Sequence, residues 1–261
     1  MLQSLRLPTG SGLALAGLLT TPENKPTYPL VILLHGFTGW KEEKHIETLA
    51  EELARAGIAV LRIDAPGSGE SEGTFENDYT MTNYISAVED VLAWAQISPG
   101  IDPERIAIWG HSMGGFVALA SAVRCPAIKA VCCCQPSSGP KTMQPGEREA
   151  WESTGWQSFS NEHFQNIRLP YSFYLERETY HARDEAPKLH IPSLFIAGTN
   201  DRSVSLEDIR KMASLAPEPT EYREFATTHG YHKYPEALND ITAATVEFFL
   251  KYLKATSTTK T

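Results

Sequence analysis

Short apolar runs alternate with helix-patterned stretches along most of this 261-residue chain. Runs typical of buried strands occupy residues 30–34, 59–63, 106–109, 130–134, 193–197 and 220–225. Apolar residues recur at helical spacing in residues 43–56, 79–96, 115–123, 206–215 and 236–252. Because strands that alternate with helices pair in parallel, the pattern predicts an α/β fold with a mostly parallel central sheet and helices on both faces. We expect one domain over residues 1–261, which opens with a hairpin of residues 2–7 and 13–20.

Composition and charge limit the kinds of molecule that the protein is expected to bind. The formal net charge is −9 and the 23 lysines and arginines form no cluster, so we expect no nucleic-acid partner and no membrane partner. The apolar stretch at 13–19 is short and interrupted by glycine, and residues 1–10 lack the charged and apolar regions of a secretion signal. We therefore expect a cytoplasmic protein, which could form a homodimer.

The four cysteines are Cys125 and the consecutive Cys132, Cys133 and Cys134. Consecutive residues of a strand point to opposite faces, and neither a Cys-x-x-Cys pair nor Cys/His zinc spacing is present. We expect the trio to be buried free thiols of a central strand. The sequence predicts no metal site and no organic cofactor.

The pentapeptide Gly110-His111-Ser112-Met113-Gly114 lies between an apolar run and an alanine-rich helical stretch. A G-x-S-x-G sequence at a sharp strand-to-helix turn holds its serine hydroxyl exposed, and the glycines keep side chains out where strand and helix approach most closely. The pattern predicts that Ser112 is a nucleophile.

A serine hydroxyl needs a base within hydrogen-bonding distance, and that base needs an acid to orient it. In this arrangement the chain order is serine, then an acidic residue, then histidine. Asp201 follows the predicted strand 193–197, which places its carboxylate at the same sheet edge as Ser112, although an aspartate in a loop is often only a turn former.

Two histidines compete for the role of base. His229 follows the predicted strand 220–225 by a few residues and precedes Gly230, which suits a tight loop that delivers the ring to Ser112. His232 lies closer to the last helix and is interpreted as a surface or helix-capping residue. His45, His163, His181 and His190 lack this arrangement and are interpreted as incidental, and His111 is interpreted as filling a variable position of the pentapeptide.

The oxyanion that forms on attack at a carbonyl needs fixed N–H donors. Met113 supplies one, because it directly follows the nucleophile. Phe37 supplies the second from the glycine-flanked loop 35–39, in which His35 is expected to brace the backbone. A purely structural turn is the alternative interpretation of this loop.

Residues 136–187 interrupt the alternation, because no run in them resembles a buried strand and eight large aromatic residues are concentrated there. A long excursion in a compact domain is usually functional or has helices of its own. We expect a small lid, inserted at about residues 137–182 over the carboxyl edge of the sheet, where ligands bind. The alternative is a helical excursion that packs its aromatic residues into the core.

Several of these motifs together resemble the α/β-hydrolase superfamily. The resemblance covers residues 28–250 and rests on the loop 35–39, the sequence Asp64-Ala-Pro-Gly-Ser-Gly-Glu-Ser-Glu-Gly73, the turn at Ser112, and the positions of Asp201 and His229. With the continuation at 73–77, the chain is most similar to the cinnamoyl and feruloyl esterase group, although residues 137–182 depart from that group's substrate-contacting pattern.

The resemblance implies Ser112 as nucleophile, His229 as base, Asp201 as its partner, and the Phe37 and Met113 N–H groups as oxyanion hole. The function expected is a serine carboxylesterase that hydrolyses small esters, of aromatic or cinnamoyl type, through an acyl-enzyme intermediate. The sequence is also compatible with a thioesterase or acyltransferase, with a lactone or C–C bond hydrolase, and with a non-catalytic binding protein.

Overall fold

The computed structural model describes residues 1–23, 25–139 and 143–254. Within these ranges the main sheet contains eight strands in the order β1-β2-β4-β3-β5-β6-β9-β10. Their bounds are β1 (Leu2–Pro8), β2 (Ala14–Thr20), β3 (Tyr28–Leu34), β4 (Ala59–Ile63), β5 (Ile101–His111), β6 (Ile128–Cys134), β9 (Ser193–Gly198) and β10 (Thr220–Phe225). The hairpin β1-β2 is antiparallel, β2 is antiparallel to β4, and all other neighbours are parallel. The mostly parallel sheet predicted from the alternating pattern is confirmed.

Strands of this sheet alternate their side chains between two apolar cores. In β3, Leu30, Ile32 and Leu34 join one core, and Val31 and Leu33 join the other. This arrangement explains why the strand reads as a continuous apolar run rather than as an alternating one.

The cysteine trio follows the same alternation. Cys132 and Cys134 face one core and Cys133 faces the other, and all three thiols are buried and free. The sequence-based interpretation of these residues as small apolar side chains of a central strand is confirmed.

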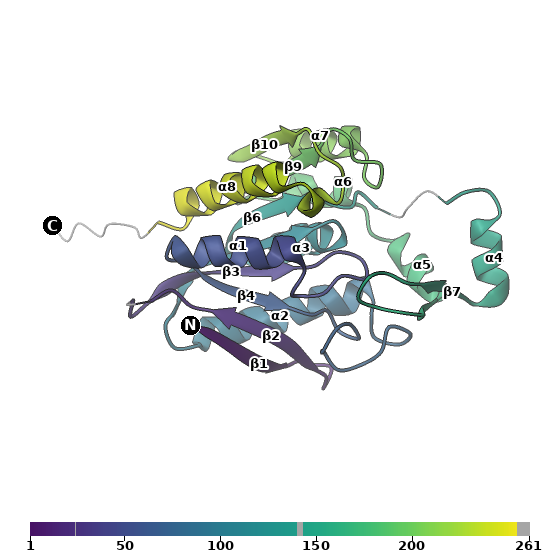
Figure 1. Ribbon diagram of the computed structural model, residues 1–261, viewed down its shortest axis with the longest axis horizontal. Coiled ribbons are helices and arrows are strands. Elements are labelled where there is room, and N and C mark those ends of the chain that lie inside the picture. The colour runs from purple at the N-terminus through teal and green to yellow at the C-terminus, as the bar shows by residue number, and fades with distance from the viewer. Residues whose placement is uncertain (24, 140–142, 255–261) are drawn as a thin grey trace.

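Helices cover both faces of the sheet (Figure 1). One face is covered by α1 (Lys44–Arg55) and α8 (Pro235–Tyr252), and the other by α2 (Met81–Ile97), α3 (Met113–Arg124) and α7 (Leu206–Leu215). In α1 the buried residues Ile46, Leu49 and Leu53 recur at helical spacing, which is why the sequence alone predicted this helix. No helix of the described residues is long and apolar enough to cross a membrane.

The chain leaves the sheet between β6 and β9, and we call residues 135–192 the insertion. It contains α4 (Glu147–Thr154), β7 (Trp156–Phe159), β8 (Ile167–Pro170), α5 (Tyr171–Arg177), α6 (Ala182–Glu185) and the 3₁₀ turn η1 (Ala186–Lys188). Its outer part projects from one side of the molecule (Figure 1). The antiparallel pair β7-β8 was not predicted, because β7 is largely exposed and carries no apolar run. Residues 140–142 of the expected lid lie outside the described residues.

Parallel pairing gathers five loops at one edge of the sheet. The loops after β3, β5, β6, β9 and β10 all follow the carboxyl ends of neighbouring strands. Residues far apart in sequence therefore meet at this edge, where open α/β sheets bind ligands.

Candidate active site

Ser112 occupies a strained turn between β5 and α3. Its φ of 56° and ψ of −118° lie outside the regions that residues with side chains favour, so the surrounding structure must hold the turn in place. A Cβ on Gly110 would overlap the carbonyl oxygen of Gly114, and one on Gly114 would overlap the carbonyl oxygen of His35. Only glycine fits at these two positions, which explains the spacing of the pentapeptide.

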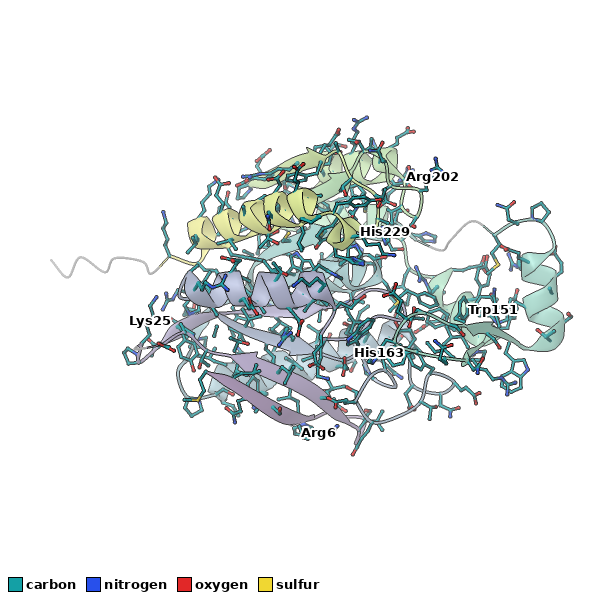
Figure 2. The ribbon with its side chains drawn as sticks, viewed as in Figure 1. Arg6, Lys25, Trp151, His163, Arg202 and His229 are labelled. Atoms are coloured by element: carbon teal, nitrogen blue, oxygen red, sulfur yellow. The ribbon has the colours of Figure 1, made fainter. Side chains whose placement is uncertain are left out.

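Three side chains from three loops form one hydrogen-bonded series. The Ser112 hydroxyl lies 2.9 Å from His229 Nε2, and His229 Nδ1 lies 2.7 Å from Asp201 Oδ2. With the proton on Nδ1, the ring donates to the carboxylate and accepts from the serine. The structure thus brings together the three residues chosen from the sequence. The His229 side chain, labelled in Figure 2, lies at Ser112. It is 23% exposed.

The Asp201 carboxylate is fully buried and surrounded by donors. Its Oδ1 accepts hydrogen bonds from the backbone N–H groups of Ser203 at 2.7 Å and Val204 at 3.1 Å. Burial raises the pKa of this carboxyl. The hydrogen bond from His229 and the two backbone donors lower it by more than burial raises it, so the net pKa lies below its ordinary value. Asp201 therefore stays ionised at neutral pH and can stabilise a positive charge on His229.

Gln135 is a member of this site that sequence reasoning missed. It follows β6 directly, is buried, and adopts a φ of 43°. Its Nε2 donates to Asp201 Oδ2 at 3.1 Å and to the Thr228 carbonyl at 3.0 Å, so it links the acid loop to the histidine loop. The only sequence signal was its position after a buried strand, at the same edge as Ser112.

Two histidines that were not expected to act in catalysis lie in one aromatic cluster with His229. The His111 ring lies 4.7 Å from the His229 ring and 4.9 Å from the His45 ring, between centroids. Burial lowers the pKa of His111 and lowers that of His45 to about 3, and the neighbouring histidines add to both shifts. Both rings are therefore neutral, and His111 packs against His229 while His45 packs against His111. His232 stacks on His45 at 5.3 Å and is not hydrogen-bonded to Ser112.

The loop after β3 lies against the turn at Ser112. A Cβ on Gly36 would meet the Ser112 Cβ at 3.2 Å, so the backbone of this loop reaches the nucleophile. In the described ranges, no backbone acceptor outside the helices and strands takes a hydrogen bond from the N–H of Phe37 or of Met113. An N–H group without an internal acceptor can donate to a substrate oxygen.

His35 braces this loop as the sequence indicated. Its Nε2 accepts from the Ala65 N–H at 3.0 Å and its Nδ1 donates to the Gly36 carbonyl at 2.8 Å. Burial lowers its pKa, so the ring stays neutral and keeps this pair of hydrogen bonds.

The insertion contacts the same loop directly. Thr38 has a φ of 55°, and its carbonyl accepts a hydrogen bond of 2.8 Å from Asn161 of the insertion. His163, labelled in Figure 2, stacks on Trp40 with ring centroids 4.2 Å apart. The insertion therefore holds the backbone that directly follows Phe37.

Aromatic side chains surround Phe37. Its ring lies 5.2 Å from Phe159 and 5.7 Å from Phe173, both from the insertion, and 6.3 Å from Tyr79.

Two cavities lie in the region of the site. One, of about 380 Å³, lies between residues 74–77 and 164–168, and the other, of about 410 Å³, lies beside the loop 225–228. Ser112 lines neither of them. In the described residues, no group of three or more His, Cys, Asp or Glu side chains is arranged to hold a metal ion.

Residues 31–241 match the sequence profile of the alpha/beta hydrolase family. Thiohydrolase aneE of Aspergillus aculeatus is 36% identical over 114 residues, which cover 44% of this chain and 35% of that protein. Among these curated relatives, the share of the relative's own length that the chain spans ranges from 32% to 62%.

Solved structures match nearly the whole chain. Est1E from Butyrivibrio proteoclasticus, in its complex with ferulic acid, has a TM-score of 0.79 at 26% identity, over 95% of this chain and 99% of that one. The alpha/beta hydrolase GrgF from Penicillium sp. sh18 has a TM-score of 0.86 at 19% identity, over 97% and 99%. The second match shows a shared fold only.

Proposed function

The chain belongs to the alpha/beta hydrolase family, and from this membership we propose that it is a serine carboxylesterase that cleaves small esters through an acyl-enzyme. The carrying observation is the hydrogen-bonded series of Ser112, His229 and Asp201, with distances of 2.9 and 2.7 Å. Spacing of this kind lets one imidazole accept the serine proton while the buried carboxylate stabilises the imidazolium.

Each half of the reaction uses the same three side chains. His229 Nε2 takes the Ser112 proton as Oγ attacks the ester carbonyl, and the tetrahedral intermediate forms. His229 then gives that proton to the departing alkoxide, which leaves an acyl-serine. A water molecule deprotonated by His229 attacks the acyl-serine, and the proton returned to Oγ releases the acid.

The backbone N–H groups of Phe37 and Met113 are proposed to hold the negative oxygen of both intermediates. Their positions support this role, because one directly follows the nucleophile and the other lies in the loop that touches Ser112. Removal of a single donor of this type typically slows such a reaction by about 10² to 10³.

The acyl or alcohol group is proposed to be apolar or aromatic. Support comes from the aromatic side chains around Phe37 and from the similarity to Est1E, whose structure holds ferulic acid. We further propose that residues 137–182 act as a lid, that residues 1–261 form one domain, and that the partner is a small ester rather than a nucleic acid or a membrane.

Thioester hydrolysis is a second candidate. The similarity to a protein named as a thiohydrolase favours it over lactone or C–C bond hydrolysis. Ester and thioester hydrolysis use the same residues, so comparison of turnover with an oxygen ester and the matching thioester distinguishes them.

The direct test is the Ser112→Ala variant. We expect it to fold as the wild type does, to lose hydrolysis of p-nitrophenyl butyrate by about 10³-fold or more, and to lose labelling by a fluorophosphonate probe. Ser153→Ala, which changes an exposed serine of α4, is the matched control and should keep both. Wild-type turnover in Ser112→Ala would refute the proposal.

A further inference from the structure

One arginine of the insertion lacks the counter-ion that its neighbours have. Arg148, Arg168 and Arg183 pair with Glu178, Glu76 and Asp208 respectively. Arg177 forms no salt bridge within residues 1–23, 25–139 and 143–254. The sequence Pro-Lys-Thr at 140–142 contains no carboxylate side chain either.

The hydrogen bonds of Arg177 engage only part of its guanidinium. Nη2 donates to Ser137 Oγ at 3.0 Å and to the Gly139 carbonyl at 3.2 Å, and both acceptors are neutral. The adjacent carboxylate, Glu176, is committed elsewhere, because it accepts the backbone N–H groups of Met81 and Thr82 at the start of α2, each at 2.9 Å. The other guanidinium donors have no acceptor in the described residues.

Two contacts place this guanidinium near the nucleophile. The Ser137 that it binds donates its own N–H to the Ser112 carbonyl at 2.9 Å. The guanidinium carbon also lies 5.9 Å from the centroid of the Phe173 ring, and that ring lies 5.7 Å from the Phe37 ring. Arg177 therefore contacts both a residue bonded to the turn at Ser112 and an aromatic residue that packs on Phe37.

The Arg177 side chain is partly buried, and desolvation of a cation is unfavourable where no anion contacts it directly. Burial lowers the pKa of Arg177 from its ordinary value, and neutral acceptors compensate less than a carboxylate does. An arginine presents its free donors as a planar fork that matches the two oxygens of a carboxylate. The other three arginines of the insertion each pair with a carboxylate, either within the insertion (Glu178) or outside it (Glu76 and Asp208).

We propose that Arg177 binds an anionic group, a carboxylate, carried by the substrate close to the scissile ester. The proposal rests on the proposed ester hydrolysis and adds a substrate class to it. Substrates of this class are half-esters, with the carboxylate on either the acyl or the alcohol side.

Matched pairs of esters test the proposal. The acyl pair is mono-p-nitrophenyl glutarate and p-nitrophenyl valerate, which share the leaving group and chain length. The alcohol pair is 4-(butyryloxy)benzoate and its methyl ester. The ratio of kcat/KM for the charged and neutral members is measured in each variant, because intrinsic reactivity cancels when ratios are compared.

We expect Arg177→Gln to lower the ratio by at least about tenfold for one of the two pairs, and that pair identifies the side that carries the carboxylate. Arg177→Lys should retain part of the preference, because it keeps the charge but not the fork. Arg183→Gln, on the same insertion and outside this contact, is the control and should leave both ratios unchanged. Equal ratios in wild type and Arg177→Gln for both pairs would overturn the proposal.

A binding measurement separates this proposal from the proposed function. The Ser112→Ala variant is titrated calorimetrically with monomethyl glutarate and with monomethyl phthalate, and the titrations are repeated in Ser112→Ala/Arg177→Gln. If the ligands bind in a way that depends on Arg177 but the wild type hydrolyses no ester, the anion site stands and the proposed esterase activity is refuted. Hydrolysis without any Arg177-dependent ratio or binding would retain the esterase and refute the anion site.

Discussion

Replacement of Asp201 by asparagine tests the proposed role of the buried carboxylate with almost no change in shape. Oδ1 of Asp201 accepts two backbone N–H groups, at 2.7 and 3.1 Å, so the amide oxygen of the asparagine must occupy that side. The amide NH₂ then replaces Oδ2, which in the wild type lies 2.7 Å from His229 Nδ1 and accepts a hydrogen bond of 3.1 Å from Gln135 Nε2 that the variant loses.

The consequence is a reversed histidine tautomer. The NH₂ group donates to Nδ1, so the proton of the neutral ring moves to Nε2, the atom 2.9 Å from the Ser112 hydroxyl. A protonated Nε2 cannot accept the serine proton. By analogy with serine hydrolases in which the same change leaves the geometry intact, kcat should fall by about 10⁴, equivalent to about 5 kcal/mol of barrier.

The assay is kcat for p-nitrophenyl butyrate at neutral pH, with circular dichroism to check folding. Arg202→Gln changes the exposed next residue, labelled in Figure 2, and should remain within about twofold of the wild type. A folded Asp201→Asn protein whose kcat lies within tenfold of the wild type would refute the tautomer reasoning and remove Asp201 from the proposed mechanism.

Two further substitutions test the surroundings of the site. Gln135→Leu removes the donor shared by Asp201 and the Thr228 carbonyl, so the free energy of unfolding in urea should fall by about 2 to 4 kcal/mol and kcat/KM by about tenfold; unchanged values of both would contradict the bracing role. Burial raises the pKa of Glu43 to about 7, and the charge of Asp64 adds to the shift. Between pH 4.5 and 7 the folded state therefore binds more protons than the unfolded state. The free energy of unfolding of the wild type should fall as the pH rises through this range. Glu43→Gln should lack this fall and exceed the wild type by at most about 3 kcal/mol above pH 7, whereas parallel stability curves for the two proteins would show that Glu43 is not perturbed.

The central sheet could be predicted because each of its strands carries its own signal. A strand such as β3, buried on both faces, is apolar at every position, and α1 shows its helical spacing without reference to its neighbours. The strands β7 and β8 carry no such signal. They are short, and β7 is exposed at every second residue, so their pairing depends on contacts within the insertion.

The residues of the site also differ in whether each carries a signal of its own in the sequence. Ser112, Asp201 and His229 belong to residue types whose chemistry is known in advance, and strand ends limit where each can lie. Gln135 and His111 could not be found in this way, because a neutral amide and a buried neutral ring act only through the side chains that they touch. Arg177 was missed for a related reason, since its missing counter-ion is a property of three-dimensional packing.

The hydrogen bond between Asn161 and the Thr38 carbonyl couples substrate selectivity to turnover. These two properties are usually engineered separately. Thr38 directly follows Phe37, so a segment proposed to contact substrate also fixes the backbone beside a proposed oxyanion donor. An exchange of the insertion for that of a relative would therefore alter turnover on every substrate, and not selectivity alone. Chimeras of this fold that keep an asparagine at position 161 retain that support while the rest of the insertion varies.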